Sequence, residues 1–337
     1  MEHSFICDCN QDELELCSIY KKILKQKYIN TKNLYASQET FKIFNNKLSS
    51  LSNCIQQFIS ITNLSITNTK LKKITNLPCN LKILNLTNND IHSIETLFPI
   101  SLEYVNLSNN KLPKLDISNS FIREIKCDNN LIKLFRGCHK LKNLCLSNNP
   151  IIELKNIYSV ELLNLNYCGL SNIDLSFCYK LYSLSIVGNF FDSLINLPKN
   201  LNLLNCSSNK IEKIILPKKL QYLYISSNKI NDLVFQNSSL IEIYCCNNNI
   251  TKIHIESPYF EKLICNENPL QYMELNSIKE ICYMNNYIIF DYPKPFKTLF
   301  WKNIELNESF ENAMKFYDFH DKITIKQLED KVLNIVL

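Results

Sequence analysis

The sequence predicts an α/β solenoid, in which one short structural unit is stacked many times. Three observations predict it. The pattern L-x-x-L-x-L-x-x-N recurs twelve times, and successive copies start 18 to 21 residues apart. The centre of each copy alternates apolar and polar residues, as a half-buried strand does. The ninth position is Asn in ten of the twelve copies. A period this regular indicates a repeat protein.

The repeats keep several positions in phase along most of the chain. The fourth position is aliphatic in every copy, and the sixth is aliphatic in seven copies and Cys in four. A degraded copy precedes the twelve, with Phe41, Ile43, Asn46 and Leu48 in register. The twelve copies start at Ile61, Leu81, Leu102, Ile122, Leu141, Val160, Leu181, Leu201, Leu220, Leu240, Phe260 and Ile278.

The spacing within a repeat predicts its local structure. The L-x-L segment is expected to be a short strand with leucines pointing inward, and successive strands are expected to pair in parallel. The ninth-position Asn has both donors and acceptors for buried backbone groups, so stacked copies should form a ladder. About ten residues then return the chain to the next start. That length is too short for a full helix, so we expect extended or 3₁₀ return segments.

A stacked repeat exposes apolar surface at both ends, so a solenoid needs caps. We divide the chain into a helical N-terminal cap at 1–37, repeats at 38–290 and a helical C-terminal cap at 291–337. In the first cap, acidic residues precede lysines along a helix expected to end near Tyr28, as the helix dipole favours. In the second, Thr324 and Gln327 form a capping-box pattern.

These repeats resemble the leucine-rich-repeat family, whose consensus also has Asn or Cys at the ninth position. The resemblance covers roughly 38–290. It implies a curved horseshoe with a parallel sheet on its concave face. It also leaves an F-box-like adaptor open for the N-terminal cap. Four repeats are preceded by an apolar residue and a proline, and these junctions look like the short repeats of bacterial type III effectors. The ubiquitin-ligase domain that those effectors often carry is not implied for this chain. The junction prolines are Pro78, Pro99, Pro198 and Pro217.

The amino-acid composition gives hints about the source of the protein and its compartment. The chain has 47 Asn, 43 Ile and 35 Lys against 2 Arg and 2 Ala. This bias resembles proteins from AT-rich genomes, such as those of giant viruses of amoebae or protists. No stretch resembles a signal peptide or a transmembrane helix. The 15 cysteines are an odd number, and five occupy repeat positions six or nine, where Cys serves as a small apolar residue. We therefore expect an intracellular, cytoplasmic protein with reduced thiols.

The sequence predicts no enzyme, no cofactor and no metal. The three glycines are isolated, which excludes a dinucleotide fingerprint or a P-loop. The five histidines are scattered, and His92 and His254 fall on return segments, where we expect solvated side chains. One alternative is a zinc site whose spacing matches no standard pattern, formed by His3, Cys7, Cys9 and Cys17.

Binding is expected on the concave face, which positions three, five and seven should line. One region there carries large side chains, and tyrosine is enriched at interfaces. The same tyrosines would also stabilise the sheet through cross-strand pairs, and the sequence does not separate the two roles. The candidate interface residues are Leu203, Tyr222, Tyr224, Glu242, Tyr244, Lys262 and Ile264.

The function class expected from this surface is a protein-binding scaffold or adaptor, monomeric, with a partner of unknown identity. One alternative is a structural component of a particle. Another is binding of a nucleic acid or an anionic membrane, although a net charge of +5 and two arginines argue against it. The observation behind the polyanion alternative is a ridge of lysines on the return segments. These are Lys70, Lys73, Lys111, Lys114, Lys210, Lys213, Lys218, Lys219, Lys229 and Lys252.

Overall fold

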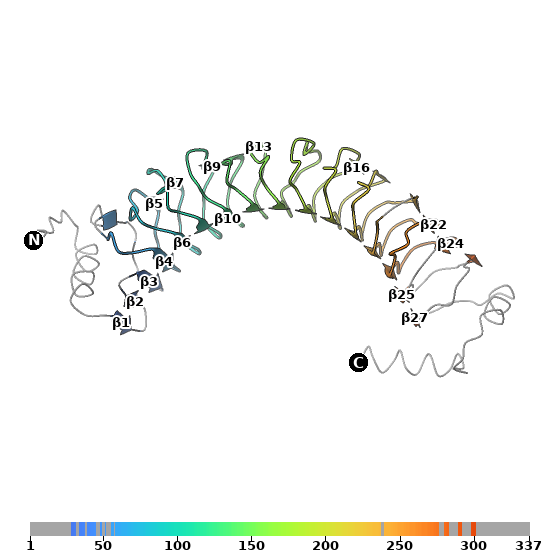
Figure 1. Cartoon of the computed structure of the whole chain (residues 1–337), viewed down its shortest axis with the longest axis horizontal. Helices are drawn as coiled ribbons and strands as arrows, with labels where there is room; N and C mark the ends of the chain where they lie inside the picture. The colour runs from blue at the N-terminus through green and yellow to red at the C-terminus, as the bar shows by residue number, and fades with distance from the viewer. Residues whose placement is uncertain are drawn as a thin grey trace, which may run out of the picture. The chain divides into compact units, whose positions relative to one another are not determined.

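The structure is a computed structural model in which stacked coils form two compact units, Met1–Leu170 and Ser171–Leu337. It describes residues 28–31, 34–37, 39–44, 48, 51, 55–56, 58–236, 239–275, 280–282, 289–291 and 298–300. In each unit the chain passes repeatedly through one row of strands and returns through a second row (Figure 1). The units are described separately below.

The first row of strands forms the principal sheet of each unit. In the first unit an antiparallel hairpin leads into parallel strands: β1 (Tyr28–Thr31), β2 (Leu34–Ser37), β3 (Thr40–Phe44), β4 (Asn63–Thr67), β6 (Ile83–Asn85), β8 (Tyr104–Asn106), β10 (Glu124–Lys126), β12 (Asn143–Cys145) and β14 (Leu162–Asn164). In the second unit the strands are β15 (Ser183–Ser185), β17 (Leu203–Asn205), β19 (Tyr222–Tyr224), β21 (Glu242–Tyr244), β23 (Lys262–Ile264), β25 (Glu280–Cys282) and β27 (Thr298–Phe300). From β6 to β25 each strand of the principal sheets occupies positions three to five of its repeat, and β4 occupies positions three to seven. The predicted L-x-L segment covers positions four to six, so the strands begin one residue earlier than expected.

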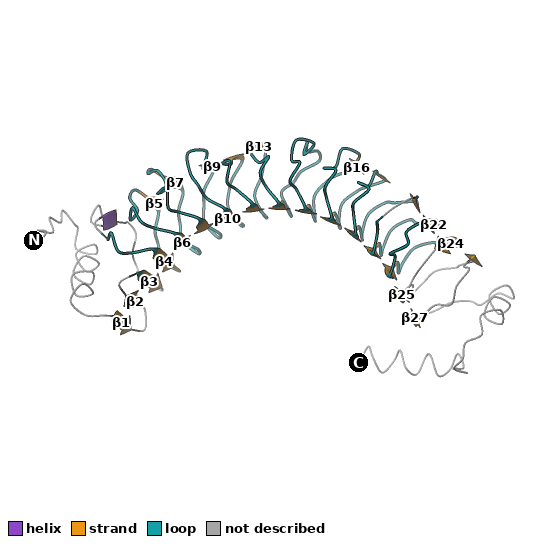
Figure 2. Ribbon diagram, viewed as in Figure 1, coloured by secondary structure: helices purple, strands orange, loops and turns teal. Residues whose placement is uncertain are grey.

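The return segments are also extended, and most of them pair with one another. The first unit has β5 (Lys73–Ile74) with β7 (Ser93–Ile94), and a separate sheet of β9 (Lys114–Asp116), β11 (Leu134–Arg136) and β13 (Glu153–Lys155). The second has β16 (Ser193–Leu194) with β18 (Lys213–Ile214), and a sheet of β20 (Asp232–Phe235), β22 (Lys252–Ile255), β24 (Tyr272–Leu275) and β26 (Ile289–Asp291). In the part of the chain that the structure describes, Figure 2 shows strands and loops, and residues 55–56 form a helical turn.

The core lies between the two rows of strands. Repeat positions one, four and six point inward and are buried, as Leu81, Leu84 and Leu86 illustrate. Burying each such side chain contributes about 1.5–3 kcal/mol. The cysteines at position six are fully buried, which confirms their role as small apolar residues; they are Cys127, Cys206, Cys245 and Cys265.

The predicted asparagine ladder is present. Asn130, for example, is buried, and its Nδ2 donates to the carbonyls of Leu107 (2.9 Å) and Cys127 (3.1 Å). Its Oδ1 accepts from the backbone N–H of Leu112 at 3.0 Å. The same pattern joins neighbouring coils at Asn110, Asn149, Asn209, Asn228, Asn248 and Asn268.

The eighth position has a constraint that the sequence pattern did not reveal. Its backbone adopts a positive φ of 54° to 67° in every coil from Asn68 to Glu267. Asn and Gly tolerate this left-handed conformation best, whereas other residues are strained in it. The residues there are Asn68, Asn88, Asn109, Asn129, Asn148, Tyr167, Gly188, Ser208, Ser227, Asn247 and Glu267.

Most of both predicted caps lies outside the described residues, including the helix expected to end near Tyr28 and the capping box. The described part of segment 1–37 consists of β1 and β2, and that of 291–337 contains β27. The strand rows therefore reach into both segments for which caps are predicted. Across the described residues no helix has the length and apolar character needed to cross a membrane.

Candidate binding surface

The seven candidate residues lie on four adjacent strands of the second unit's principal sheet. One row runs through Leu203, Tyr222, Glu242 and Lys262, which are direct partners from β17 to β23. A second row runs through Tyr224, Tyr244 and Ile264. We call these seven residues the tyrosine patch. All seven are half-buried, so each side chain shows part of its surface to solvent and packs on its neighbours with the rest.

Two of the tyrosines form a stacked pair. The rings of Tyr224 and Tyr244 have centroids 4.8 Å apart and lie within 18° of parallel. The Nζ atom of Lys262 lies 5.8 Å from the centroid of the Tyr244 ring, within the range of a cation–π contact. Such cross-strand aromatic contacts stabilise a sheet. They also hold the rings in one orientation, which lowers the entropy lost when a partner covers them.

The tyrosine patch carries a carboxylate among the rings. Glu242 lies between Tyr222 and Lys262 in the register, and within the described residues it makes no ion pair. Burial raises the pKa of Tyr224, and the negative charge of Glu242 raises it further. The hydroxyl therefore stays protonated at neutral pH and acts as a hydrogen-bond donor and acceptor.

A second apolar pair, which the sequence reading passed over, lies on the principal sheet of the first unit. Ile83 and Tyr104 are direct partners on β6 and β8, and they are 43% and 45% exposed. They are thus more exposed than any residue of the tyrosine patch. Both stand at position three of consecutive repeats, so the same register rule could have identified them.

The lysine ridge is partly neutralised. Lys73 pairs with Glu95 at 3.3 Å, and Lys111 pairs with Asp90 at 2.6 Å. The ammonium groups of Lys210 and Lys252 lie over the rings of Phe190 and Tyr272, at 5.1 Å and 5.2 Å from the centroids. The two ion pairs offset part of the charge that the return segments present to a polyanion, whereas the lysines over the rings keep their charge.

His254 differs from the expectation of a solvated side chain. Its side chain is 16% exposed, and it lies between Glu274 (Nδ1 to Oε2, 2.6 Å) and Glu256 (Nε2 to Oε1, 3.2 Å). Desolvation lowers the pKa of His254, but the hydrogen bonds to the two carboxylates outweigh it, so the pKa is raised overall. Because parallel pairing places Glu274 directly beside His254 on β22 and β24, the cluster depends on tertiary register.

Several of the described cysteines are poor nucleophiles because they are buried. Burial raises the pKa of Cys145, Cys168 and Cys178 to about 11, so these thiols stay protonated at neutral pH. Cys245 is buried and Cys246 is half-buried, as the strand alternation predicts for this pair. No disulfide joins the described cysteines.

The stacked coils, the parallel principal sheets and the buried asparagine ladder define the leucine-rich-repeat fold. Comparison with solved structures agrees. The YopM protein of Yersinia enterocolitica WA-314 has a TM-score of 0.61 at 22% identity, over 90% of this chain and 70% of that one. YopM of Yersinia pestis, described as a leucine-rich effector protein, gives 0.58 at 22% identity, over 86% and 99%.

A leucine-rich-repeat protein of Leptospira interrogans gives a TM-score of 0.56 at 18% identity, over 85% of this chain and 90% of that one. At such identities the likeness establishes the fold alone. No family model matches the chain. None of the curated proteins matches it either.

Proposed function

We propose that this chain is a non-catalytic scaffold that binds a partner protein through the tyrosine patch. The observation that carries the proposal is the stacked pair of Tyr224 and Tyr244 on the exposed side of the principal sheet, flanked by Tyr222, Glu242 and Lys262. Tyrosine is enriched among the residues that carry most of the binding energy at protein interfaces.

The geometry supports a recognition role in addition to sheet stabilisation. The stack alone would satisfy the stabilising role, but stabilisation does not require a carboxylate at Glu242, beside Tyr222 in the register. A partner side chain that covers the rings would reach this carboxylate as well. The surface therefore supplies apolar area and a directional acceptor together.

The test is affinity capture of partners by the intact chain, with substitutions on and off the patch. The patch variant replaces Tyr222, Tyr224 and Tyr244 with Ala. The matched control replaces three exposed tyrosines of the same unit, namely Tyr179, Tyr182 and Tyr259. Loss of captured proteins in the patch variant alone would support the proposal. Retention of every captured protein by a folded patch variant would refute it and leave the stack with a structural role.

A further inference from the structure

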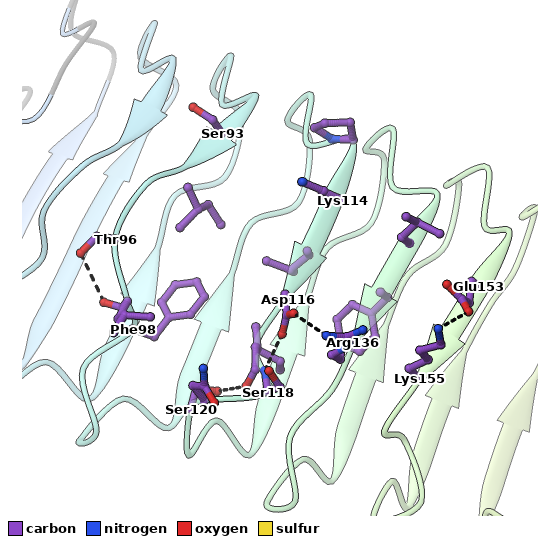
Figure 3. Close-up of a pocket in the computed structure, with 18 of the residues that line it drawn as sticks. Ser93, Thr96, Phe98, Lys114, Asp116, Ser118, Ser120, Arg136, Glu153 and Lys155 are labelled. Carbon is purple, nitrogen blue, oxygen red and sulfur yellow. Dashed lines mark hydrogen bonds and ion pairs between the residues drawn. The ribbon is translucent and has the colours of Figure 1, made fainter.

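A hollow of about 550 Å³ lies on the return side of the first unit, beside β7, β9 and β11 (Figure 3). It adjoins a longer repeat. The copy that starts at Leu81 has 21 residues, one more than the next copy. The chain from Thr96 to Phe98 leaves the strand row, and β7 and β9 fall in separate sheets.

The hollow opens the core between these two strands. Ile74 and Ile94 are register partners on β5 and β7, yet Ile74 is fully buried and Ile94 is half-buried. Buried rings of Phe98 and Phe135 also line the hollow. Its rim is apolar too, since Leu134 is 45% exposed. A volume of this size is typical of ligand pockets and holds one or more bulky side chains.

The edge of β9 toward β7 is open. Pro113 O and Ile117 N bond toward β11, so by strand alternation the backbone groups of Lys114 and Asp116 face β7. No hydrogen bond in the described part of the chain joins residues 112–118 to residues 92–98. The hollow therefore combines apolar surface with unpaired backbone donors and acceptors.

The charges around the hollow leave a positive excess. Carboxylates on these return segments are each paired with a cation, as Asp116 is with Arg136 (3.4 Å) and Glu153 is with Lys155 (2.5 Å). Lys114 makes no ion pair within the described residues. Arg136 uses one N–H on Asp116, and its remaining guanidinium donors have no partner among the described residues.

We propose that this hollow binds an acidic peptide segment that carries a bulky apolar side chain. The apolar side chain fills the space beside Phe98, Ile94 and Phe135. Flanking carboxylates meet Lys114 and the free donors of Arg136, a pairing that Arg geometry favours. The site lies on the return side of the first unit, so it is independent of the tyrosine patch.

The test is selection of a phage-displayed library of random dodecapeptides on the full chain. Enriched sequences are then synthesised with a fluorophore, and their binding is measured by fluorescence polarisation. We expect enriched peptides with one large apolar residue next to Asp or Glu. Lys114→Glu and Leu134→Asp change exposed side chains, so the fold is kept, and each should weaken binding roughly tenfold.

The matched control is Lys213→Glu with Ile215→Asp, at an exposed return strand of the second unit. It should bind these peptides as the original chain does, and so should the variant with three tyrosines of the patch replaced. The proposal is overturned if no sequence is enriched, if enriched peptides lack acidic residues, or if they bind the Lys114→Glu and Leu134→Asp variants unchanged.

Discussion

Replacing one asparagine of the buried ladder tests whether the ladder, and not leucine burial alone, holds neighbouring coils together. In Asn130→Ala the backbone N–H of Leu112 loses the acceptor that it has in the structure. Asn130 donates to three carbonyls, of which Asp128 O is the longest contact at 3.3 Å. The other two each keep a second donor, because Asn110 also reaches Leu107 O (3.0 Å) and Asn149 also reaches Cys127 O (2.9 Å). The Leu112 N–H is therefore left without an acceptor, and three carbonyls each lose one donor.

The expected cost follows from this count. An unsatisfied buried N–H costs about 1–3 kcal/mol, and each lost hydrogen bond about 0.5–1.5 kcal/mol. The sum is roughly 2–5 kcal/mol. Asn130→Asp should cost more at neutral pH, because it places a carboxylate oxygen against two carbonyls in the core. Part of that extra cost should disappear at low pH, where the carboxyl is protonated and donates.

The measurement is urea unfolding of the full chain by circular dichroism, with amide hydrogen exchange at Leu112 as a local readout. Repeat proteins can unfold in parts, so the local readout guards against a misleading global midpoint. The control is the adjacent Asn129→Gly, which is exposed at a φ of 56° and should change stability by less than about 0.5 kcal/mol. A cost below about 1 kcal/mol for Asn130→Ala, with unchanged exchange at Leu112, would refute the reasoning.

Three further outcomes are expected. His254→Gln should lower the unfolding free energy more at pH 5.5 than at pH 8, and the difference should be up to about 1 kcal/mol. The raised pKa of His254 gives stability below about pH 6.5, and this stability is lost as the pH rises. Urea titrations at both pH values check this prediction. Glu267→Gly should raise stability by about 0.5–1 kcal/mol in the same assay, because it relieves a φ of 58°. Phe135→Ala should cost about 3–5 kcal/mol, measured by the shift in urea midpoint, because its ring is buried in the core.

The sequence predicted the principal sheet because each strand is encoded within one repeat and the period transfers it to the next. It did not predict the pairing of the return segments, which depends on how neighbouring coils stack. Nor does it show how the ladder tolerates its exception at Cys168. There the thiol donates to Leu146 O at 3.2 Å, and the N–H of Ile151 bonds instead to Asn149 O at 2.9 Å. The backbone carbonyl of Asn149 therefore accepts the N–H that an asparagine side chain accepts in other coils.

The same reasoning distinguishes the two proposed binding surfaces. The tyrosine patch was predictable because residues at equal repeat positions become direct neighbours in a parallel sheet, so a row of side chains can be read from the sequence. The hollow was not, because it forms where the repeat is one residue longer and the return strands β7 and β9 fail to pair. In this chain the regular positions build the principal sheets and keep their register, whereas the hollow depends on two neighbouring return strands, β7 and β9, that do not pair.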